Sequence, residues 1–165
     1  MFKGILEEYD PEYESMGLDE ANLDLTNYLV ENGLNTDDGK QAVVLEIRTR
    51  IEEATRLTCS SGISCNKMLA KILTDMKKPN GQTYLKPDKD EILNFMKTLS
   101  VRKIPGIGRM TELTLASLEV FTCADILEKA CEIYVSFSER TSHFLFRAAL
   151  GISRNFHEED DDDAC

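Results

Sequence analysis

Alternation of apolar and polar residues, which is typical of a half-buried strand, is confined to the first half of this chain. Residues 16–26 contain two short alternating runs, and β-favouring runs recur at residues 57–63 and 83–85. After Leu99 we find no convincing strand, and apolar residues recur at helical spacing. The chain is therefore predicted to be an α/β (α+β) protein, in which a mixed sheet with helices is followed by a small all-helical region.

Two adjacent acids, Asp19 and Glu20, lie where the first two alternating runs meet. Neighbouring side chains of a strand point to opposite faces, so a turn or bulge is needed to bring both carboxylates to one point. Magnesium takes oxygen ligands and often shares them with phosphates, which makes Asp19 and Glu20 candidate metal ligands. Asp-Glu pairs in hairpin turns are also commonly solvated, and the pair alone leaves that alternative open.

A polar loop is expected at residues 31–40, and Asp37 or Asp38 can cap the helix that follows it. The apolar stripe of this helix comprises Val43, Ile47, Ile51 and Ala54. Earlier in the chain, residues 2–9 are predicted to end a helix. Later, Asp88 and Glu91 form a capping box that opens a helix at the end of the α/β region. That helix should bury Ile92, Phe95, Met96 and Leu99.

The buried strand predicted at residues 57–63 leads into a helix that Ser64 is expected to cap. Its inward residues should be Met68, Leu69, Ile72 and Met76. Lys67 and Lys71, four residues apart, share the other side of this helix. Open α/β sheets bind ligands beyond the ends of their strands, so both lysines are candidates to meet a ligand there. Two solvated surface lysines are the alternative.

A Pro-Gly-Ile-Gly turn at residues 105–108 connects a short predicted helix to a longer one. Its glycines permit a tight turn and close approach of a ligand, and the amides that start the next helix favour an anion. Arg102, Lys103 and Arg109 flank this position. The pattern is that of a helix-hairpin-helix, which grips a nucleic-acid phosphate without reading bases; a glycine-rich connection between helices is the alternative. The residues predicted to contact DNA are Lys103, Pro105, Gly106, Ile107, Gly108, Arg109, Met110 and Thr111.

Charge restricts how such a chain can bind DNA. The formal net charge is −11, and residues 158–163 contribute six of these negative charges in a run predicted to be disordered. DNA contacts must therefore come from locally placed lysines, arginines and backbone amides. The five cysteines form no C-x-x-C pair, which favours reduced thiols over a zinc site. No apolar run approaches the roughly 20 residues of a membrane span, so a soluble, intracellular protein is expected.

Four segments, taken in order, resemble the Y-family translesion DNA polymerases, most closely those of the kappa type. They are residues 17–24, 61–71, 78–81 and 104–108. The resemblance implies a partial polymerase palm over residues 1–97 and a thumb with a helix-hairpin-helix over residues 98–152. Residues 153–165 would form a disordered acidic tail.

The same resemblance implies roles for individual residues. Asp19 would bind both catalytic magnesium ions, and Glu20 would bind the ion that activates the primer 3′-hydroxyl. Lys71 would contact the incoming triphosphate, and residues 105–108 would hold a backbone phosphate of primer-template DNA. Deoxynucleoside triphosphates would be the other substrate, and the protein would be located in the nucleus. A replication clamp would be a partner that binds through regions absent from this chain.

The sequence also departs from the family pattern. The family's first palm carboxylate and its fingers do not lie ahead of Met1, and its little finger does not follow residue 152. Gly17 stands where Ser is usual, and Asn22 where an aromatic residue is usual. We therefore expect this chain alone to be inactive as a polymerase. A non-catalytic DNA-binding module is the main alternative, and an acidic tail that mimics DNA and shields the thumb is a weaker one.

Overall fold

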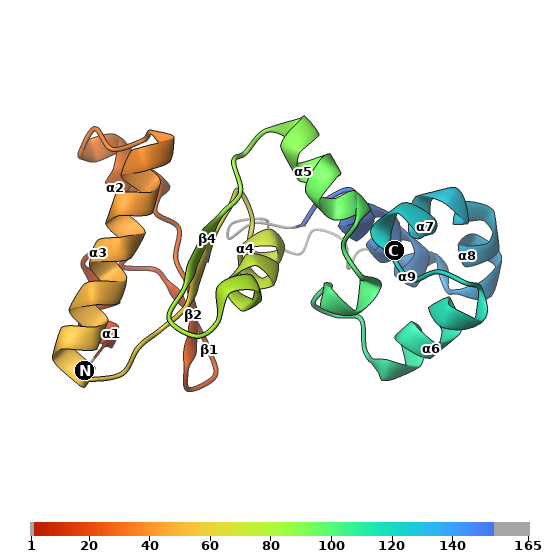
Figure 1. The fold of residues 1–165 in the computed structure, drawn as a ribbon, viewed down its shortest axis with the longest axis horizontal. Helices are drawn as coiled ribbons and strands as arrows, with labels where there is room; N and C mark the ends of the chain where they lie inside the picture. The colour runs from red at the N-terminus through yellow and green to blue at the C-terminus, as the bar shows by residue number, and fades with distance from the viewer. Residues whose placement is uncertain (1, 154–165) are drawn as a thin grey trace, which may run out of the picture. The chain divides into compact units, whose positions relative to one another are not determined.

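The computed structural model describes residues 2–153, which divide into two compact units. Within that range, the first unit comprises residues 2–63 and 73–84, and the second comprises residues 64–72 and 85–153. The first unit mixes helices with strands, and the second is helical, which confirms the predicted fold class. The chain runs from red to blue in Figure 1.

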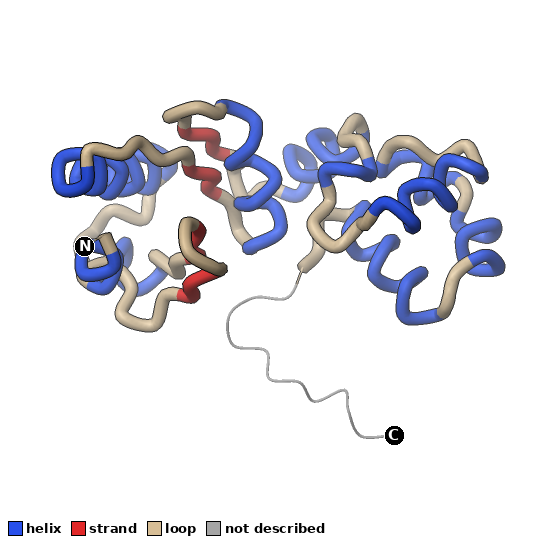
Figure 2. Tube along the Cα trace, turned by 90° about the horizontal axis from the view of Figure 1, so that it is seen from below, coloured by secondary structure: helices blue, strands red, loops and turns tan. Residues whose placement is uncertain are grey.

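The elements of the first unit follow one another in a simple order. They are α1 (Lys3–Glu7), β1 (Glu14–Met16), β2 (Glu20–Asn22), α2 (Thr26–Glu31), α3 (Asp37–Thr55), β3 (Ser61–Ile63), the 3₁₀ helix η1 (Asp75–Lys77) and β4 (Gln82–Tyr84). In the described residues the strands form two pairs, shown in red in Figure 2. β1 and β2 pair antiparallel, and β3 and β4 pair parallel. A strand pair around Asp19 and Glu20 and the strand–helix–strand order were both predicted, but the paired strands are residues 14–16 and 20–22 and extend only partly over the predicted runs at residues 16–26.

The core of the first unit lies between the long helix α3 and the short helices α1 and α2. Its fully buried apolar residues are Leu6, Tyr9, Leu29, Val43 and Ile47. The predicted stripe of α3 is correct for Val43 and Ile47, whereas Ala54 is exposed near the end of the helix. The predicted cap was wrong: Thr36 accepts a hydrogen bond from the Gly39 amide at 3.0 Å.

Two local differences from the sequence prediction have a common cause. Helix α2 was not predicted: it lies between the alternating runs that end at residue 26 and the loop expected from residue 31, and its Leu29 enters the core with Tyr9. The Asp37 carboxylate does not cap α3; it accepts a hydrogen bond from the Tyr84 hydroxyl at 2.6 Å. In both cases a contact that is distant in the sequence overrides local preference.

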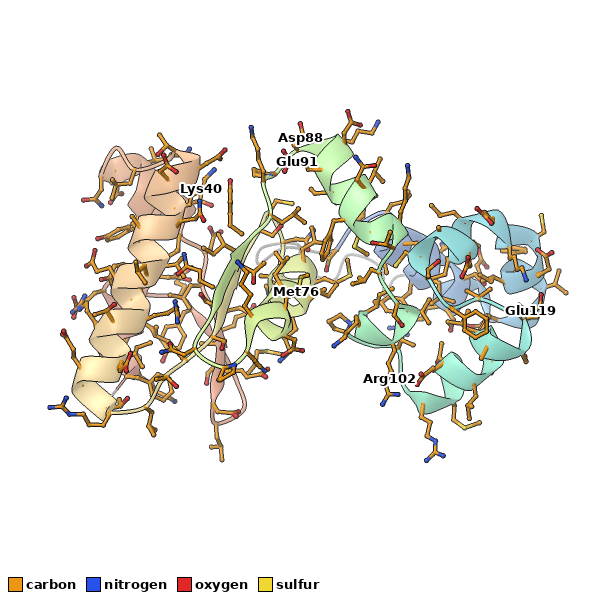
Figure 3. The ribbon with its side chains drawn as sticks, viewed as in Figure 1. Lys40, Met76, Asp88, Glu91, Arg102 and Glu119 are labelled. Carbon is orange, nitrogen blue, oxygen red and sulfur yellow. The ribbon has the colours of Figure 1, made fainter. Side chains whose placement is uncertain are left out.

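The second unit contains six α-helices and one 3₁₀ helix in the described residues. They are α4 (Lys67–Thr74, of which residues up to 72 belong here), α5 (Lys89–Lys97), η2 (Val101–Lys103), α6 (Arg109–Ser117), α7 (Cys123–Glu128), α8 (Ala130–Ser136) and α9 (Glu139–Ala149). One core joins them and includes Leu69, Met96, Ile104, Leu115, Ile126 and Leu145. Asp88 caps α5 as predicted, accepting from the amides of Asp90 and Glu91, and Figure 3 shows Asp88 and Glu91 at the start of this helix. The reciprocal half of the predicted capping box is not formed, because the Asp88 amide donates to the Lys86 carbonyl at 2.8 Å instead of to Glu91.

Some predicted core positions of the helices are exposed. Met76 lies in η1, beyond the end of α4, and is 57% exposed. Two further apolar side chains on the helices are also exposed, Phe144 at 37% and Leu113 at 55%. The predicted cap Ser64 is replaced by Asn66, whose side-chain oxygen accepts from the Leu69 amide at 2.9 Å. Asn66 also donates to the Gly151 carbonyl at 2.9 Å, which ties the start of α4 to the end of α9.

The predicted division at residue 97 remains a prediction about domains. In the structure α5 and the first residues of α4 pack with the helical unit. The proposed acidic tail lies outside the described residues. None of the helices in residues 2–153 has the length and apolar character needed to cross a membrane.

Candidate functional site

The two adjacent acids lie at the tip of the β1–β2 hairpin, called here the acidic hairpin (residues 14–22). Met16 pairs with Glu20, so residues 17–19 form the turn. Asp19 closes the turn and Glu20 begins β2, and both residues are exposed. The turn therefore provides the change of direction that two neighbouring carboxylates need in order to act at one point.

Gly17 gives a physical reason for one departure from the family pattern. Its φ angle is +79°, in the left-handed region that glycine adopts without a steric penalty. The tight turn between Met16 and Glu20 uses this conformation. Leu18, between Gly17 and Asp19, is 95% exposed. The acids are thus presented on a short, protruding turn.

A buried carboxylate fixes the base of the acidic hairpin. Asp10 is only 8% exposed and accepts hydrogen bonds from the Glu12 amide at 3.0 Å and the Asp24 amide at 2.7 Å. These two amides flank the strands on opposite sides. Asp10 thereby holds the beginning and the end of the hairpin together, in place of a longer sheet.

A lysine that the sequence analysis did not select lies near the acids. Lys78 pairs with Asp75 at 2.6 Å, and this hydrogen bond is the main reason why the pKa of Lys78 is raised. The negative charges of Glu20 and Asp19 add to the same shift of its pKa. Residues 78–81 were used in the prediction only as one segment of the family pattern, and that match was a signal that could have drawn attention to Lys78.

The loop that carries Lys78 has a tightly specified conformation. At Gly81, an added Cβ would lie 1.9 Å from the backbone oxygen of Lys77, so a side chain cannot be accommodated without moving the backbone. Asn80 adopts a φ of +49°, a conformation that Asn tolerates better than most residues. The Gly81 carbonyl accepts from the Ser61 amide at 3.0 Å, which links the loop to β3.

Asp19 and Glu20 are the two candidate oxygen ligands at the tip of the acidic hairpin. Among residues 2–153, no group of three or more His, Cys, Asp or Glu side chains is arranged to hold a metal ion. Two carboxylates nevertheless suit magnesium, which is commonly bound by one or two carboxylates together with phosphates and water. Asp19 and Glu20 therefore fit a metal that is completed by a phosphorylated substrate or by further oxygen ligands.

The two lysines selected from the sequence lie on α4. Lys67 begins this helix and Lys71 follows one turn later, which places both on one side, as predicted. Both are partly buried, whereas Met68, Leu69 and Ile72 of the same helix enter the core. They belong to the second unit, and the acids belong to the first.

The predicted hairpin of the second unit has the expected local form. Residues 104–108, called here the glycine hairpin, connect η2 to α6. Gly106 has a φ of +96°, and an added Cβ would lie 3.0 Å from Cζ of Phe144 on α9. Gly108 is the N-cap of α6 without a side-chain cap, and nothing lies within 4 Å of its added Cβ. The first amides of α6 therefore receive no side-chain cap from Gly108.

Basic side chains surround the start of α6. Arg102, Lys103 and Arg109 are exposed, and the long side chain of Arg102 extends outward in Figure 3. The Arg102 guanidinium lies 3.7 Å from the Glu112 carboxylate, a solvent-screened pair. Of the other predicted contact residues, Pro105 and Met110 are exposed, and Ile107 and Thr111 are half-buried. Cations beside uncapped helix amides form a favourable position for an anion.

Comparisons of the sequence and of the fold with known proteins agree with one another. Residues 1–75 match the model of the impB/mucB/samB family. The chain is 37% identical over 149 residues to DNA polymerase kappa of Arabidopsis thaliana. The aligned residues are 90% of this chain and 22% of that protein. It is 39% identical over 124 residues to DNA polymerase kappa of Homo sapiens, covering 75% of this chain and 14% of that protein.

A solved structure shows the same fold over nearly the whole chain. The Y-family DNA polymerase chimera Dbh-Dpo4(243-245)-Dbh superimposes with a TM-score of 0.83 at 28% identity, covering 95% of this chain and 44% of the chimera. The present chain thus spans less than half of each protein that it was compared with here.

Proposed function

Because the chain belongs to the Y family of DNA polymerases, we propose that it is part of an enzyme that extends a DNA primer past damaged template bases. The observation that carries this proposal is the acidic hairpin. Asp19 closes the turn and Glu20 begins the next strand, and Lys78 lies close enough for both charges to raise its pKa. Opposite charges placed around one exposed turn suit a substrate that brings phosphates and a divalent cation.

In the proposed reaction Asp19 and Glu20 hold magnesium. The bound ions would neutralise phosphate charge and favour attack by the primer 3′-hydroxyl. Asp19 would contact both ions and Glu20 one of them. The exposed position of both side chains leaves their oxygen atoms accessible to such ligands.

Lysines supply the positive charge that the triphosphate requires. Lys78 projects from a loop beside the acids, and we assign to it a contact with the phosphates of the incoming nucleotide. For Lys71 we propose the same contact with the triphosphate, because residues 61–71 resemble the family segment in which this lysine has that role. A lysine is a compact point charge, which suits a phosphate group that changes its charge during reaction.

The second unit would hold the DNA. We assign to residues 104–111 a helix-hairpin-helix, in which the amides at the start of α6 donate hydrogen bonds to a backbone phosphate and Lys103 and Arg109 add positive charge. The contact uses local charge, and the net charge of the chain does not oppose it strongly at physiological salt. Residues 1–97 would then serve as palm and residues 98–152 as thumb. The protein would act in the nucleus, and a replication clamp would bind it through regions outside this chain.

Nucleotide binding by the full 165-residue chain tests the proposal. A fluorescent deoxynucleoside triphosphate should bind more tightly in Mg²⁺ than in EDTA, and Asp19→Asn or Glu20→Gln should remove most of this difference. Lys78→Ala should weaken binding in Mg²⁺. Glu53→Gln and Lys97→Ala change exposed residues elsewhere and serve as matched controls. Equal affinity in Mg²⁺ and EDTA for the wild-type chain would contradict the catalytic assignment.

A non-catalytic DNA-binding module is the second candidate, because the glycine hairpin alone suffices for it. That function predicts that the chain binds duplex DNA in a salt-dependent manner and that Arg109→Ala weakens this binding. It also predicts that Asp19→Asn leaves nucleotide binding unchanged. Template-directed extension by the polymerase that contains this chain, lost in Asp19→Asn, would exclude it.

A further inference from the structure

We propose that the outward face of α6 contacts the deoxyribose rings of the bound DNA strand through Met110 and Leu113, and so discriminates DNA from RNA. This inference rests on the proposed DNA binding by the glycine hairpin. It adds a sugar contact, made by apolar side chains, to the phosphate contact made by amides and cations.

The first observation is that α6 exposes large apolar side chains. Met110 is 75% exposed and Leu113 is 55% exposed, whereas Leu115 of the same helix is fully buried. Residues three apart on a helix are neighbours on one face, so Met110 and Leu113 form a continuous apolar surface. This surface lies away from the core that Leu115 enters.

The second observation is the charge around this surface. Met110 directly follows Arg109 and is the second residue of α6, and Lys103 and Arg102 are exposed at the other side of the glycine hairpin. The acid beside Leu113 on this helix, Glu112, is paired with Arg102 at 3.7 Å, and Lys103 and Arg109 add further positive charge. An apolar surface bordered by these cations and by uncapped helix amides is complementary to a polyanion that also has apolar parts. The sugar-phosphate backbone of DNA has this character, since each deoxyribose lies between two phosphates.

The third observation is a contrast within the same unit. Helix α8 also exposes apolar residues, with Tyr134 at 55% and Val135 at 85%. Its exposed neighbour Glu132 is acidic, and so is Glu128 at the end of α7. A polyanion would be repelled there. The two apolar surfaces therefore differ in the charge beside them, and α6 is the one suited to a nucleic-acid strand.

Discrimination between sugars follows from desolvation. The C2′ methylene of deoxyribose can lie against Met110 or Leu113 without loss of a hydrogen bond. In RNA the 2′-hydroxyl at that position would lose water without gaining a partner, which is unfavourable. Apolar side chains at this place therefore favour DNA over RNA.

The test measures binding of the full chain to a DNA duplex and to an RNA duplex of the same sequence, over a range of salt concentrations. The variant Met110→Gln with Leu113→Gln keeps side-chain length and helix propensity while removing the apolar contact. We expect about tenfold weaker DNA binding, given the usual contribution of a buried apolar side chain. The DNA-to-RNA preference should fall, and the slope of log K against log salt should not change.

Two further variants separate this contact from its alternatives. Arg109→Ala should lower the affinity and reduce the salt slope by about one, as expected for a lost phosphate contact. Val135→Gln changes the other exposed apolar surface and should bind DNA like the wild type. Because Met110 and Leu113 are exposed, their replacement should leave the thermal unfolding temperature unchanged, and the single variant Met110→Gln provides a milder test.

The outcomes distinguish the inference from the function on which it rests. If the wild-type chain shows no salt-dependent DNA binding, the proposed DNA-binding function fails, and this inference fails with it. If the wild type binds DNA but the double glutamine variant binds as tightly, or loses DNA and RNA binding in equal proportion, only the sugar contact is refuted. A change of salt slope in that variant would likewise refute it.

Discussion

The guanidinium group of Arg48 joins the loop of Asn80 to helix α3. Its Nη2 donates to Oδ1 of Asn80 at 2.5 Å, and its Nε donates to the carbonyl of Cys59 at 3.0 Å. One side chain thereby positions the segment before β3 and the loop before β4. That loop carries Lys78, the lysine beside the acidic hairpin.

Arg48 is not proposed to touch the nucleotide, but loss of its two hydrogen bonds should weaken nucleotide binding because they position the loop that carries Lys78. We expect Arg48→Ala to loosen residues 78–81, to destabilise the first unit by about 1 kcal/mol, as for one lost hydrogen bond, and to weaken triphosphate binding. Arg48→Lys keeps the charge but not the two directed bonds, and should resemble the alanine variant. Faster hydrogen exchange at the Gly81 amide is the direct measurement. Thr49→Ala, at an exposed neighbouring position, is the control; unchanged exchange in Arg48→Ala would contradict the role.

The two glycines of the glycine hairpin should respond differently to alanine. Gly106→Ala places a side chain at a φ of +96° and against Phe144, and we expect a loss of about 1–2 kcal/mol in the free energy of unfolding. Gly108→Ala meets no atom within 4 Å and should fold normally. It should nevertheless weaken DNA binding, because the new methyl group lies where a phosphate would approach the α6 amides. Chemical denaturation and duplex binding measure the two effects; equal stability of both variants would be inconsistent with this assignment.

The capping box of α7 predicts a loss of stability in acid. Thr122 accepts from the Asp125 amide, and the Asp125 carboxylate accepts from the amides of Phe121 at 2.9 Å and Thr122 at 2.8 Å. These amides, Phe121 first, lower the pKa of Asp125. A lowered pKa in the folded state contributes stability at pH values above the unfolded pKa of about 4 and loses it as the pH falls through the folded pKa.

The unfolding temperature should accordingly fall between pH 5 and pH 2, and Asp125→Asn should lower stability at pH 6 and flatten this dependence. Asp90→Asn, an exposed acid in the first turn of α5, is a suitable comparison. An acid profile of Asp125→Asn that parallels the wild type would refute the role of the carboxylate.

The buried thiol of Cys123 predicts a loss of stability at high pH. Burial, assisted by the charge of Asp125, raises the pKa of Cys123 to about 11. A raised pKa contributes stability that is complete below the unfolded value near 9 and disappears as the pH rises through the folded value. Cys123→Ala should therefore reduce the alkaline loss between pH 9 and pH 11, whereas Cys131→Ala, at an exposed position, should not. Native Cys123 should also resist thiol reagents that modify Cys65 and Cys131; rapid modification of all three would contradict its burial.

The local features of this chain could be predicted from its sequence, since neighbouring residues determine them. The acids at the junction of two alternating runs, the Pro-Gly-Ile-Gly turn and the Asp88 cap all occur where the pattern indicates, because periodicity, turns and caps depend on a few adjacent residues. The family resemblance drew on the same short segments. Helix type and order in the second unit were likewise predicted, as no strand competes there.

The tertiary structure alone decided which distant residues meet. Arg48 and Asn80 are 32 positions apart, and Tyr84 reaches Asp37 across 47 positions. Nothing local to either residue specifies such a partner; packing of separate segments selects it. The same packing draws Leu29 into the core, leaves Met76 and Leu113 in solvent, and places Lys78 beside the acids. The sequence by itself therefore determined the fold class, the family and the two hairpins, and the tertiary structure determined how their side chains are held, because burial and charge depend on all the neighbours in space.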